Sequence, residues 1–346
     1  MDMKNEWNDL NHQRLRLSLD SIALLLYCSE FYDCDELPLS VTEWNDLEKM
    51  LRASQLKRPA ALLALEYEAI MINLDIDEEL SHKIASRNKG IAFLLEQLQR
   101  MESLGVLVTT KYEEEYPYQL KRKMKKNMPL ILYYSGDITM LKDPLVCVAG
   151  PIRSNRRIDQ NTRAVISKLN EEDYTLISCG NRGVETLAMK HQLRIGGKAV
   201  NFLCGNIIIE MKEYLRPIKN GQMLLVSAVY PFANFDLVHA IDRNQYVFSL
   251  AEVAIIMYSQ INSGAVWLSA MQNFTQRWTK LAAIMDDEFY GNARLIELGA
   301  IGLTMDMIQS PLTLSELLDQ EEEKIQETES YDQISIYEFL GEQYEI

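Results

Sequence analysis

The chain has 346 residues, of which 47% are apolar and 25% are charged, so its length suits about two folded domains and its composition is that of an ordinary globular protein. This balance excludes a wholly disordered chain and a fibrous one. No apolar run reaches the roughly 18 residues of a membrane helix, and the first residues are polar and acidic, unlike a secretory signal, so we expect a cytoplasmic protein without a membrane segment.

The formal net charge is −15, from 35 basic and 50 acidic residues, but this charge is unevenly distributed. Residues 316–346 contain eleven acidic residues and one lysine, which leaves −5 for the rest of the chain. Net charge alone therefore does not exclude a polyanionic partner. The five cysteines are scattered and lack the spacing of zinc ligands, so we expect reduced thiols, no metal and no cofactor.

The first third of the chain is predicted to be helical. Predicted helices span residues 20–27, 44–53, 59–69 and 91–104. Asp20 is expected to cap the first helix, Ser40 and Glu43 have the spacing of a capping box, and Gly105 ends the last helix. We therefore expect an N-terminal helical domain, SAM-like or extended, over residues 1–110.

From residue 106 the apolar pattern changes to short strands that alternate with helices. Strands are predicted at 106–108, 130–134, 145–149, 174–178, 199–204, 223–227, 253–258 and 282–285. Helices are predicted at 159–169 and 184–193, and another begins at Ser263-Gly264. Uninterrupted apolar strands separated by helices indicate an α/β fold with a parallel sheet covered on both faces.

Small residues follow several of these strands. Gly150 follows one strand, Ser178, Gly180 and Gly183 follow the next, and Gly205 and Ser263-Gly264 follow two more. Ligands of parallel sheets bind at the carboxyl ends of the strands, where small residues admit a backbone and helix N-termini attract anions. The sequence therefore predicts an anion-binding crevice there.

Basic and aromatic residues near these turns favour a nucleic acid as the anion. The basic residues are Arg153, Arg156, Arg157, Arg163, Arg182, Lys190, Arg194, Lys198 and Arg243. Such a cluster either neutralises phosphates or forms a solvated helix face. Ser178, Asn181, Asn206 and Asn244 could add hydrogen bonds. Four aromatic residues either stack on bases or pack in the core or a dimer interface: Phe202, Tyr230, Phe232 and Phe235.

Catalytic motifs are absent from the sequence. It has no GxxxxGK[ST] loop, GxGxxG, GxSxG or HExxH motif, and the four histidines are far apart. Asp286-Asp287 is an acidic pair that either binds a metal or forms a solvated turn. No residues form a catalytic constellation, so we expect a protein that is not an enzyme.

Short motifs occur in a fixed order between residues 112 and 303. They are Tyr116-Pro117 with Leu120, Pro129–Asp137, Val146–Gly150 with Arg153, Ser178–Glu185, Gly196–Gly205, Ser227–Pro231, Arg243-Asn244, Ser263-Gly264 and Gly291–Ala300. In this order they resemble the motifs of the DprA/Smf family of DNA-processing proteins, which protect incoming single-stranded DNA and pass it to the recombinase. The last motif closely follows the family pattern GxNxLIxxGA.

The resemblance implies a Rossmann-like domain with a doubly wound, mostly parallel sheet over residues 111–304, between the N-terminal helical domain and an acidic C-terminal tail at 305–346. It also implies a non-enzymatic homodimer that binds single-stranded DNA on a basic rim and has a recombinase as partner. The residues expected to bind DNA are Gly150, Arg153, Arg156, Arg157, Ser178, Asn181, Arg182, Gly183, Lys198, Asn206, Arg243, Asn244, Ser263 and Gly264.

The chain also departs from the family motifs. Pro151 stands where the family has serine, Cys179 replaces glycine, Glu185 replaces aspartate, and Ala228 and Tyr258 replace acidic residues. The acidic tail replaces the winged helix of many members. These departures favour an alternative, a DprA-like antitoxin that neutralises a partner toxin in a bacterial anti-phage system. A nucleotide-processing hydrolase is a third hypothesis, disfavoured by the two missing carboxylates.

Two charged segments each allow two interpretations. Lys121–Lys126 has five basic residues in six and is either a second phosphate contact or a solvated linker. The acidic tail is either a disordered, solubilising end or a mimic of nucleic acid that folds over the basic residues or docks on a basic partner. Apolar residues that interleave with its acids favour the second interpretation.

Overall fold

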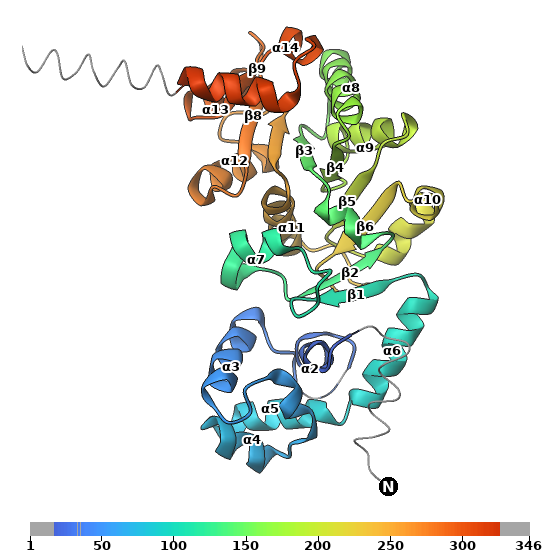
Figure 1. Ribbon diagram of the computed structural model, residues 1–346, viewed down its shortest axis with the longest axis vertical. Coiled ribbons are helices and arrows are strands. Elements are labelled where there is room, and N and C mark those ends of the chain that lie inside the picture. The colour runs from blue at the N-terminus through green and yellow to red at the C-terminus, as the bar shows by residue number, and fades with distance from the viewer. Residues whose placement is uncertain (1–16, 33, 35, 326–346) are drawn as a thin grey trace, which may run out of the picture. The chain divides into compact units, whose positions relative to one another are not determined.

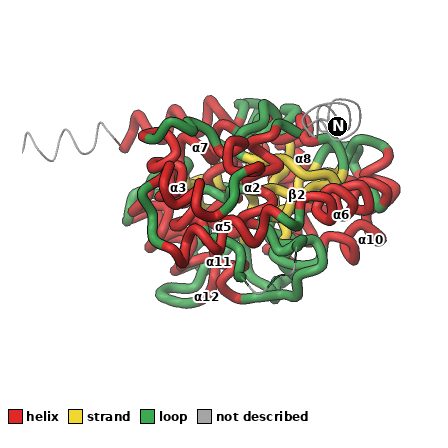
Figure 2. Tube along the Cα trace, turned by 90° about the horizontal axis from the view of Figure 1, so that it is seen from below, coloured by secondary structure: helices red, strands yellow, loops and turns green. Residues whose placement is uncertain are grey.

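The computed structural model describes residues 17–32, 34 and 36–325. The chain divides into two compact units, Met1–Lys142 with Val200–Leu250 and Asp143–Ala199 with Ala251–Ile346. We call these the first unit and the second unit. Helices make up most of the chain outside the strands, as Figure 2 shows in red.

The first unit begins with helices, as predicted. They are α2 (Leu19–Cys28), α3 (Val41–Ala53), the 3-10 helix η1 (Pro59–Ala64), α4 (Tyr67–Leu74), α5 (Glu78–Asn88) and α6 (Ile91–Ser103). The capping box is confirmed: the Glu43 N–H donates to Ser40 Oγ over 3.2 Å, and the Ser40 N–H donates to the Glu43 carboxylate over 2.7 Å. Lys83 also binds this carboxylate, and together these contacts lower the pKa of Glu43 to about 2 despite partial burial.

Two expectations for these helices are wrong. Ser18, rather than Asp20, caps α2, and the helix predicted at 59–69 is instead η1 followed by a separate α4. Asp20 explains both differences, because its carboxylate accepts hydrogen bonds from the Ala60 N–H over 2.9 Å and from the Arg58 guanidinium. A tertiary contact thus overrides the local helical pattern.

The helical part is held together by a buried arginine. Arg87 on α5 is 1% exposed, and its guanidinium donates to the carbonyl oxygens of Leu26, Ser29 and Glu36 over 2.7, 2.8 and 2.9 Å. These carbonyls lie in the last turn of α2 and the segment after it, where they have no helical partner. The side chain therefore satisfies backbone oxygens that burial would otherwise leave unpaired.

The first unit also contains β1 (Leu107–Thr110), β2 (Ile131–Ser135), β5 (Ala199–Leu203) and β6 (Met223–Ser227), in the order β1-β2-β6-β5. The pairs β1–β2 and β2–β6 are antiparallel. The connecting helices are α7 (Tyr118–Met124), η2 (Lys125–Asn127), η3 (Ile138–Lys142), α10 (Ile207–Lys219) and α11 (Leu237–Leu250). The basic run Lys121–Lys126 is therefore helical, so its interpretation as a linker is wrong.

The second unit is a parallel sheet. Its strands are β3 (Leu145–Ala149), β4 (Thr175–Ser178), β7 (Val253–Ile256), β8 (Lys280–Ile284) and β9 (Ile301–Leu303), in the order β4-β3-β7-β8-β9. Its helices include α8 (Arg156–Glu171), α9 (Val184–Arg194), α12 (Gly264–Gln276), α13 (Tyr290–Glu297) and α14 (Met305–Gln309). All four strand pairs are parallel, which confirms the predicted mostly parallel sheet.

The direction of the chain reverses between β3 and β7. From β3 the chain passes through α8 to β4 on one side, and from β7 it passes through α12 to β8 on the other. Right-handed crossovers that run in opposite directions place α8 and α12 on opposite faces of the sheet, as Figure 1 shows. The crevice between the carboxyl ends of β3 and β7 is therefore the position at which doubly wound sheets bind ligands.

A buried asparagine fixes this edge of the sheet. The Asn292 amide donates to the carbonyl oxygens of Ile256, Met257 and Ile284 over 3.2, 3.3 and 2.9 Å. It thereby joins the last residues of β7 and β8 to the start of α13. A Cβ at Gly291 would lie 2.0 Å from the Ser259 carbonyl oxygen, so only glycine allows the helix to approach so closely.

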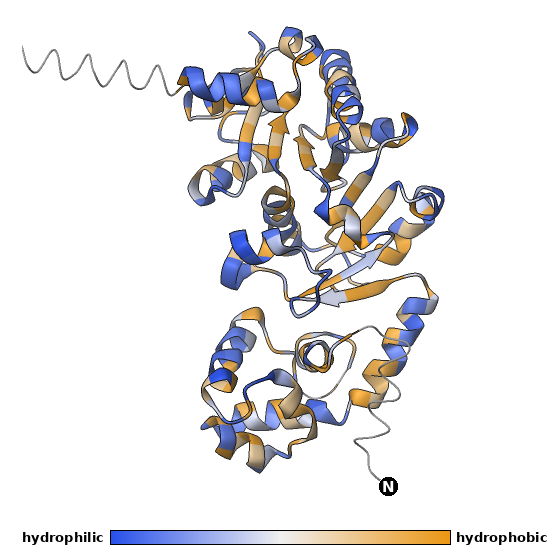
Figure 3. Ribbon diagram, in the orientation of Figure 1, coloured by the Kyte–Doolittle hydropathy of each residue, from blue (hydrophilic) through white to orange (hydrophobic). Residues whose placement is uncertain are grey.

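The strands form the core, and they are orange along most of their length in Figure 3. Of the residues expected in the acidic tail, 305–325 are part of the second unit: 314–325 are helical, and Leu314, Leu317 and Leu318 are buried. Lys280 pairs with Asp319 and Glu322 there. The remainder of that tail, 326–346, lies outside the described residues.

All five cysteines are free thiols. No helix within the described ranges is long and apolar enough to cross a membrane.

We predict that Gly183→Ala lowers the free energy of unfolding by about 3 kcal/mol or more, because Gly183 has a φ of +82° and a Cβ there would lie 2.3 Å from the Pro151 carbonyl oxygen. Gly196→Ala is the matched control: φ is +91° but no atom lies within 4 Å, so only the backbone strain of about 1–2 kcal/mol applies. Urea unfolding followed by circular dichroism measures both. Equal losses would show that the contact with Pro151 is unimportant.

Candidate nucleic-acid interface

Two turns at the carboxyl edge of the second unit fit into each other. Gly150 follows β3, and a Cβ there would lie 2.8 Å from the side chain of Val184 at the start of α9. The Val184 N–H donates to the Pro151 carbonyl over 3.2 Å, and Gly183 lies against the same carbonyl. The sequence thus brings together Gly150 and Gly183, as expected, because both positions exclude a side chain.

The turn after β4 is ordered by a carboxylate. Glu185 is 6% exposed and accepts hydrogen bonds from the Asn181 N–H over 3.2 Å and the Asn181 side-chain amide over 3.0 Å. The Ser178 hydroxyl also donates to this carboxylate, over 3.5 Å, and accepts a hydrogen bond from the Gly180 N–H. Ser178 is only 1% exposed. Ser178 and Asn181 therefore shape the turn, and the expected role of the buried Ser178 as a direct DNA ligand is wrong.

Three arginines around these turns are exposed. Arg153 lies in the loop after β3, Arg156 is the first residue of α8, and Arg182 lies in the turn before α9. None of the three forms an ion pair with any residue in the described ranges. Asn155 caps α8 by accepting from the Ile158 N–H. We call Gly150, Arg153, Arg156, Arg182 and Gly183 the arginine rim.

Arg157, unlike these three arginines, forms ion pairs. Its guanidinium binds Asp286 over 2.5 Å and Glu288 over 3.3 Å, and it lies 5.9 Å from the centre of the Phe289 ring. The Asp286 side chain is only 5% exposed. The expectation of a solvated Asp286-Asp287 turn is therefore wrong for Asp286, and the positive charge of Arg157 is already compensated.

The turn after β7 presents a helix start. Ser263 and Gly264 are exposed, and Gly264 has a φ of +81°. Ser263 is the N-cap residue of α12, but its side chain makes no capping hydrogen bond. The first N–H groups of α12 are thus available to an anion at the point where β3 and β7 adjoin.

Three predicted site residues lie in the first unit. Arg243 on α11 is 7% exposed, and its guanidinium donates to Cys204 Sγ over 3.3 Å and to the Asn244 side-chain oxygen over 3.1 Å. Asn206 caps α10 by accepting from the Ile209 N–H over 3.2 Å. Asn206 follows β5, and Arg243 reaches the end of the same strand through Cys204, but the polar atoms of these side chains are engaged within the protein.

Lys198 is wrongly placed on the rim by the sequence analysis. It precedes β5, and its ammonium binds Asp143, which precedes β3, over 3.2 Å. Both residues stand before their strands, at the amino ends. Sequence proximity to the glycines had suggested the carboxyl edge, but a strand separates Lys198 from that edge.

A second basic surface lies between α8 and α9, which pack side by side (Figure 1). We call it the α8/α9 groove. It has a volume of about 430 Å3 and is lined by Arg163, Arg182, Gly183, Thr186, Leu187, Lys190, His191 and Arg194. Burial and the neighbouring Arg194 and Arg163 lower the pKa of His191. The sequence places these cations near the predicted rim, but only the packing of α8 on α9 brings them into one groove.

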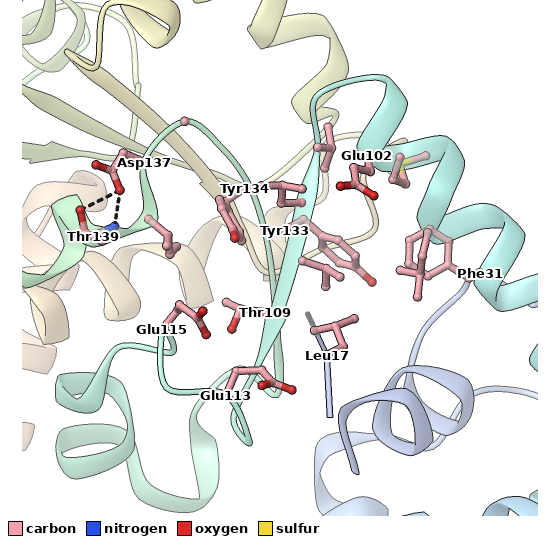
Figure 4. A pocket seen from close by; sticks show the side chains of 17 residues that line it. Leu17, Phe31, Glu102, Thr109, Glu113, Glu115, Tyr133, Tyr134, Asp137 and Thr139 are labelled. Atoms are coloured by element: carbon pink, nitrogen blue, oxygen red, sulfur yellow. Dashed lines mark hydrogen bonds between the residues drawn. The ribbon is translucent and has the colours of Figure 1, made fainter. Parts of the chain in front are cut away.

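A cavity larger than this groove is acidic rather than basic. It lies in the first unit beside β1 and β2 and has a volume of about 700 Å3. Glu102, Glu113, Glu115 and Asp137 are among its lining residues, as Figure 4 shows. Carboxylates repel phosphates, so this acidic cavity is unsuited to a polyanion.

The aromatic candidates separate by burial. Phe202 is 0% exposed and packs on Tyr246, so its expected alternative role in the core is confirmed. Tyr230 contacts Phe31 and Phe232 edge-on. Phe235 is 70% exposed, and its backbone lies beside Gly205 at the end of β5.

The sequence model of the family described as DNA recombination-mediator protein A matches residues 107–310, which include all nine strands. The chain belongs to this family. Membership confirms the resemblance indicated by the motifs, which neither composition nor charge could have established.

Known relatives are distant in sequence. The DNA processing protein DprA of Streptococcus pneumoniae (strain ATCC BAA-255 / R6) is 23% identical over 214 residues, or 60% of this chain and 73% of the relative. The X-ray structure of DprA from S. pneumoniae is 18% identical with a TM-score of 0.59, and the match covers 80% of this chain and 100% of that one. This likeness confirms the Rossmann-like fold.

A structure of DNA processing protein A from Helicobacter pylori, described for its single-stranded DNA binding mode, is 22% identical with a TM-score of 0.49, and the match covers 58% of this chain and 92% of that one.

We predict that Asp286→Asn tightens binding to single-stranded DNA and steepens its salt dependence by up to about 0.7, because Arg157 then loses its buried partner and only the exposed Glu288 competes with a phosphate for it. Glu297→Gln is the control, since it also removes one carboxylate from an arginine, Arg294, elsewhere on the same unit. Fluorescence anisotropy at several salt concentrations measures both variants. If Asp286→Asn and Glu297→Gln change binding equally, Arg157 lies outside the DNA path.

Proposed function

We propose that this protein binds single-stranded DNA through the arginine rim, as a DNA-processing protein of its family. One observation carries the proposal: Arg153, Arg156 and Arg182 are exposed and have no carboxylate partner among the described residues, at the edge where a doubly wound sheet binds ligands. The chain before residue 316 carries a net charge of −5, so a cluster of uncompensated arginines stands out on it.

Each part of the edge has a distinct role in the proposal. The three guanidiniums neutralise phosphates, since arginine presents fixed donors that match phosphate oxygens. The first N–H groups of α12, after Ser263-Gly264, donate hydrogen bonds to a further phosphate oxygen. Gly150 and Gly183 have no side chains, so the backbone of the DNA can approach the turns closely.

The proposed activity is binding without catalysis, in the cytoplasm. The carboxylates near the rim, Glu185 and Asp286, are engaged with Asn181 and Arg157. They therefore hold the turns and compensate charge rather than face the crevice as an acid and a base. A homodimer and a hand-over to a recombinase are expectations from the family resemblance.

We predict that the double variant Arg153→Ala/Arg156→Ala weakens binding to oligothymidylate and lowers the slope of log affinity against log salt by about 1.4, or about 0.7 for each lost phosphate contact. Arg52→Ala/Arg58→Ala is the matched control, because it removes two exposed arginines from the helical part of the first unit. Anisotropy titrations at several salt concentrations provide the slopes. An unchanged slope for the rim variant contradicts the proposal.

A regulatory role with a protein partner is the second candidate. The acidic cavity beside β1 favours it, because apolar residues and four carboxylates in one hollow suit a basic segment of another protein. A toxin neutralised by this chain would supply such a segment. Co-purification with the product of the neighbouring gene, lost in Glu102→Lys/Glu115→Lys, tests this role; retention of the partner by that variant contradicts it.

A further inference from the structure

The α8/α9 groove is a positively charged hollow that the proposed rim does not explain. Arg163 comes from α8, and Lys190 and Arg194 come from α9. No carboxylate is among its lining residues in the described ranges. A groove lined by basic side chains and by no described carboxylate suits an anion.

One of these cations is held in place by a neutral histidine. His191 Nδ1 lies 2.7 Å from Arg194 Nη2, and its Nε2 lies 3.2 Å from Ser167 Oγ. Because a guanidinium can only donate, Nδ1 is the acceptor, and the ring is the neutral tautomer that donates through Nε2. The lowered pKa of His191 agrees with this assignment. The ring therefore orients Arg194 without adding a charge of its own.

The groove is continuous with the arginine rim. Arg182 and Gly183 belong to both surfaces, since they form the rim turn and also line the groove. Thr186, Lys190 and Arg194 follow at intervals of four residues, so they rise along one side of α9 by about 6 Å at each step. Such a row suits a ligand with evenly repeated negative charges better than a single small anion.

We propose that the α8/α9 groove binds the sugar–phosphate backbone of the single strand where it leaves the arginine rim, so that the strand passes from the carboxyl edge of the sheet along α9. The inference rests on the proposed function. Among the described residues, the groove is lined by no Phe, Tyr or Trp, and the His191 ring is engaged by Arg194 and Ser167, so the groove binds phosphates and leaves the bases unread. Its effect therefore depends on the length of the strand and not on its sequence.

The test uses the full chain, the double variant Arg163→Gln/Lys190→Gln, and oligothymidylates of about 6 and about 20 nucleotides, which span the usual range of binding-site sizes. The short strand occupies the rim alone, so the variant and the wild type bind it equally. For the long strand, the variant loses roughly tenfold in affinity at moderate salt, and its salt slope falls by about 1.4.

Two further variants provide controls. Lys212→Gln/Lys219→Gln removes the same charge from the exposed side of α10 and should bind both strands like the wild type. Arg163→Lys/Lys190→Arg keeps the groove charge and should retain the long-strand affinity, which separates lost charge from lost folding. The inference is overturned if either control variant loses as much affinity for the long strand as the groove variant does.

The outcomes also separate this inference from the proposed function. If Arg153→Ala/Arg156→Ala lowers the affinity for both oligothymidylates and the groove variant lowers neither affinity, the groove inference fails and the proposal for the rim stands. If neither variant weakens binding, both fail. If the groove variant loses binding to a polyglutamate peptide but keeps the long strand, the groove binds acidic protein segments, and the inference is overturned.

Discussion

The close contact between the turns after β3 and β4 is the constraint on which the site depends. Gly183 lies against the carbonyl of Pro151, and Val184 occupies the space that a side chain at Gly150 would fill. This contact fixes where α9 begins relative to the loop that carries Arg153. Three guanidiniums from separate segments are thereby held around one edge, before any ligand is present to order them.

Charge compensation distinguishes the surfaces of this acidic protein. Carboxylates neutralise Arg157 through Asp286 and Lys198 through Asp143, whereas Arg153, Arg156 and Arg163 have no such partner in the described residues. An exposed cation next to a carboxylate contributes little to phosphate binding, because the anion must first displace that partner. The distribution of ion pairs is therefore a better guide to the proposed phosphate-binding edge than the count of basic residues.

The fold could be predicted from the sequence to a large extent, because uninterrupted apolar strands and glycine-marked turns are local signals. The predicted strands at 145–149 and 223–227 agree with β3 and β6 to the residue. The three-residue β9 was missed because it is too short to show a period. Antiparallel pairing of β1 and β2 was also missed, since strand direction is set by partners distant in sequence.

The site was less predictable, because ion pairs and burial depend on tertiary contacts. Nothing near Arg157 in the sequence indicates Asp286 as its partner. Ser178 lies in a glycine-rich turn, where the sequence suggests an exposed ligand, but the residue is buried. Glu185, a departure from the family motif, proved to be the acceptor that orders Asn181. The shared groove of Arg163 and Arg194 follows only from the packing of α8 on α9.

Hydrogen–deuterium exchange of the full chain, with and without a long oligothymidylate, tests the central claim most directly. If the rim binds the strand backbone, DNA slows exchange in peptides that cover 150–157, 180–184 and 262–266, where the exposed amides and arginines lie. Slowed exchange confined to the helical part of the first unit, or to the surroundings of the acidic cavity, would contradict the account.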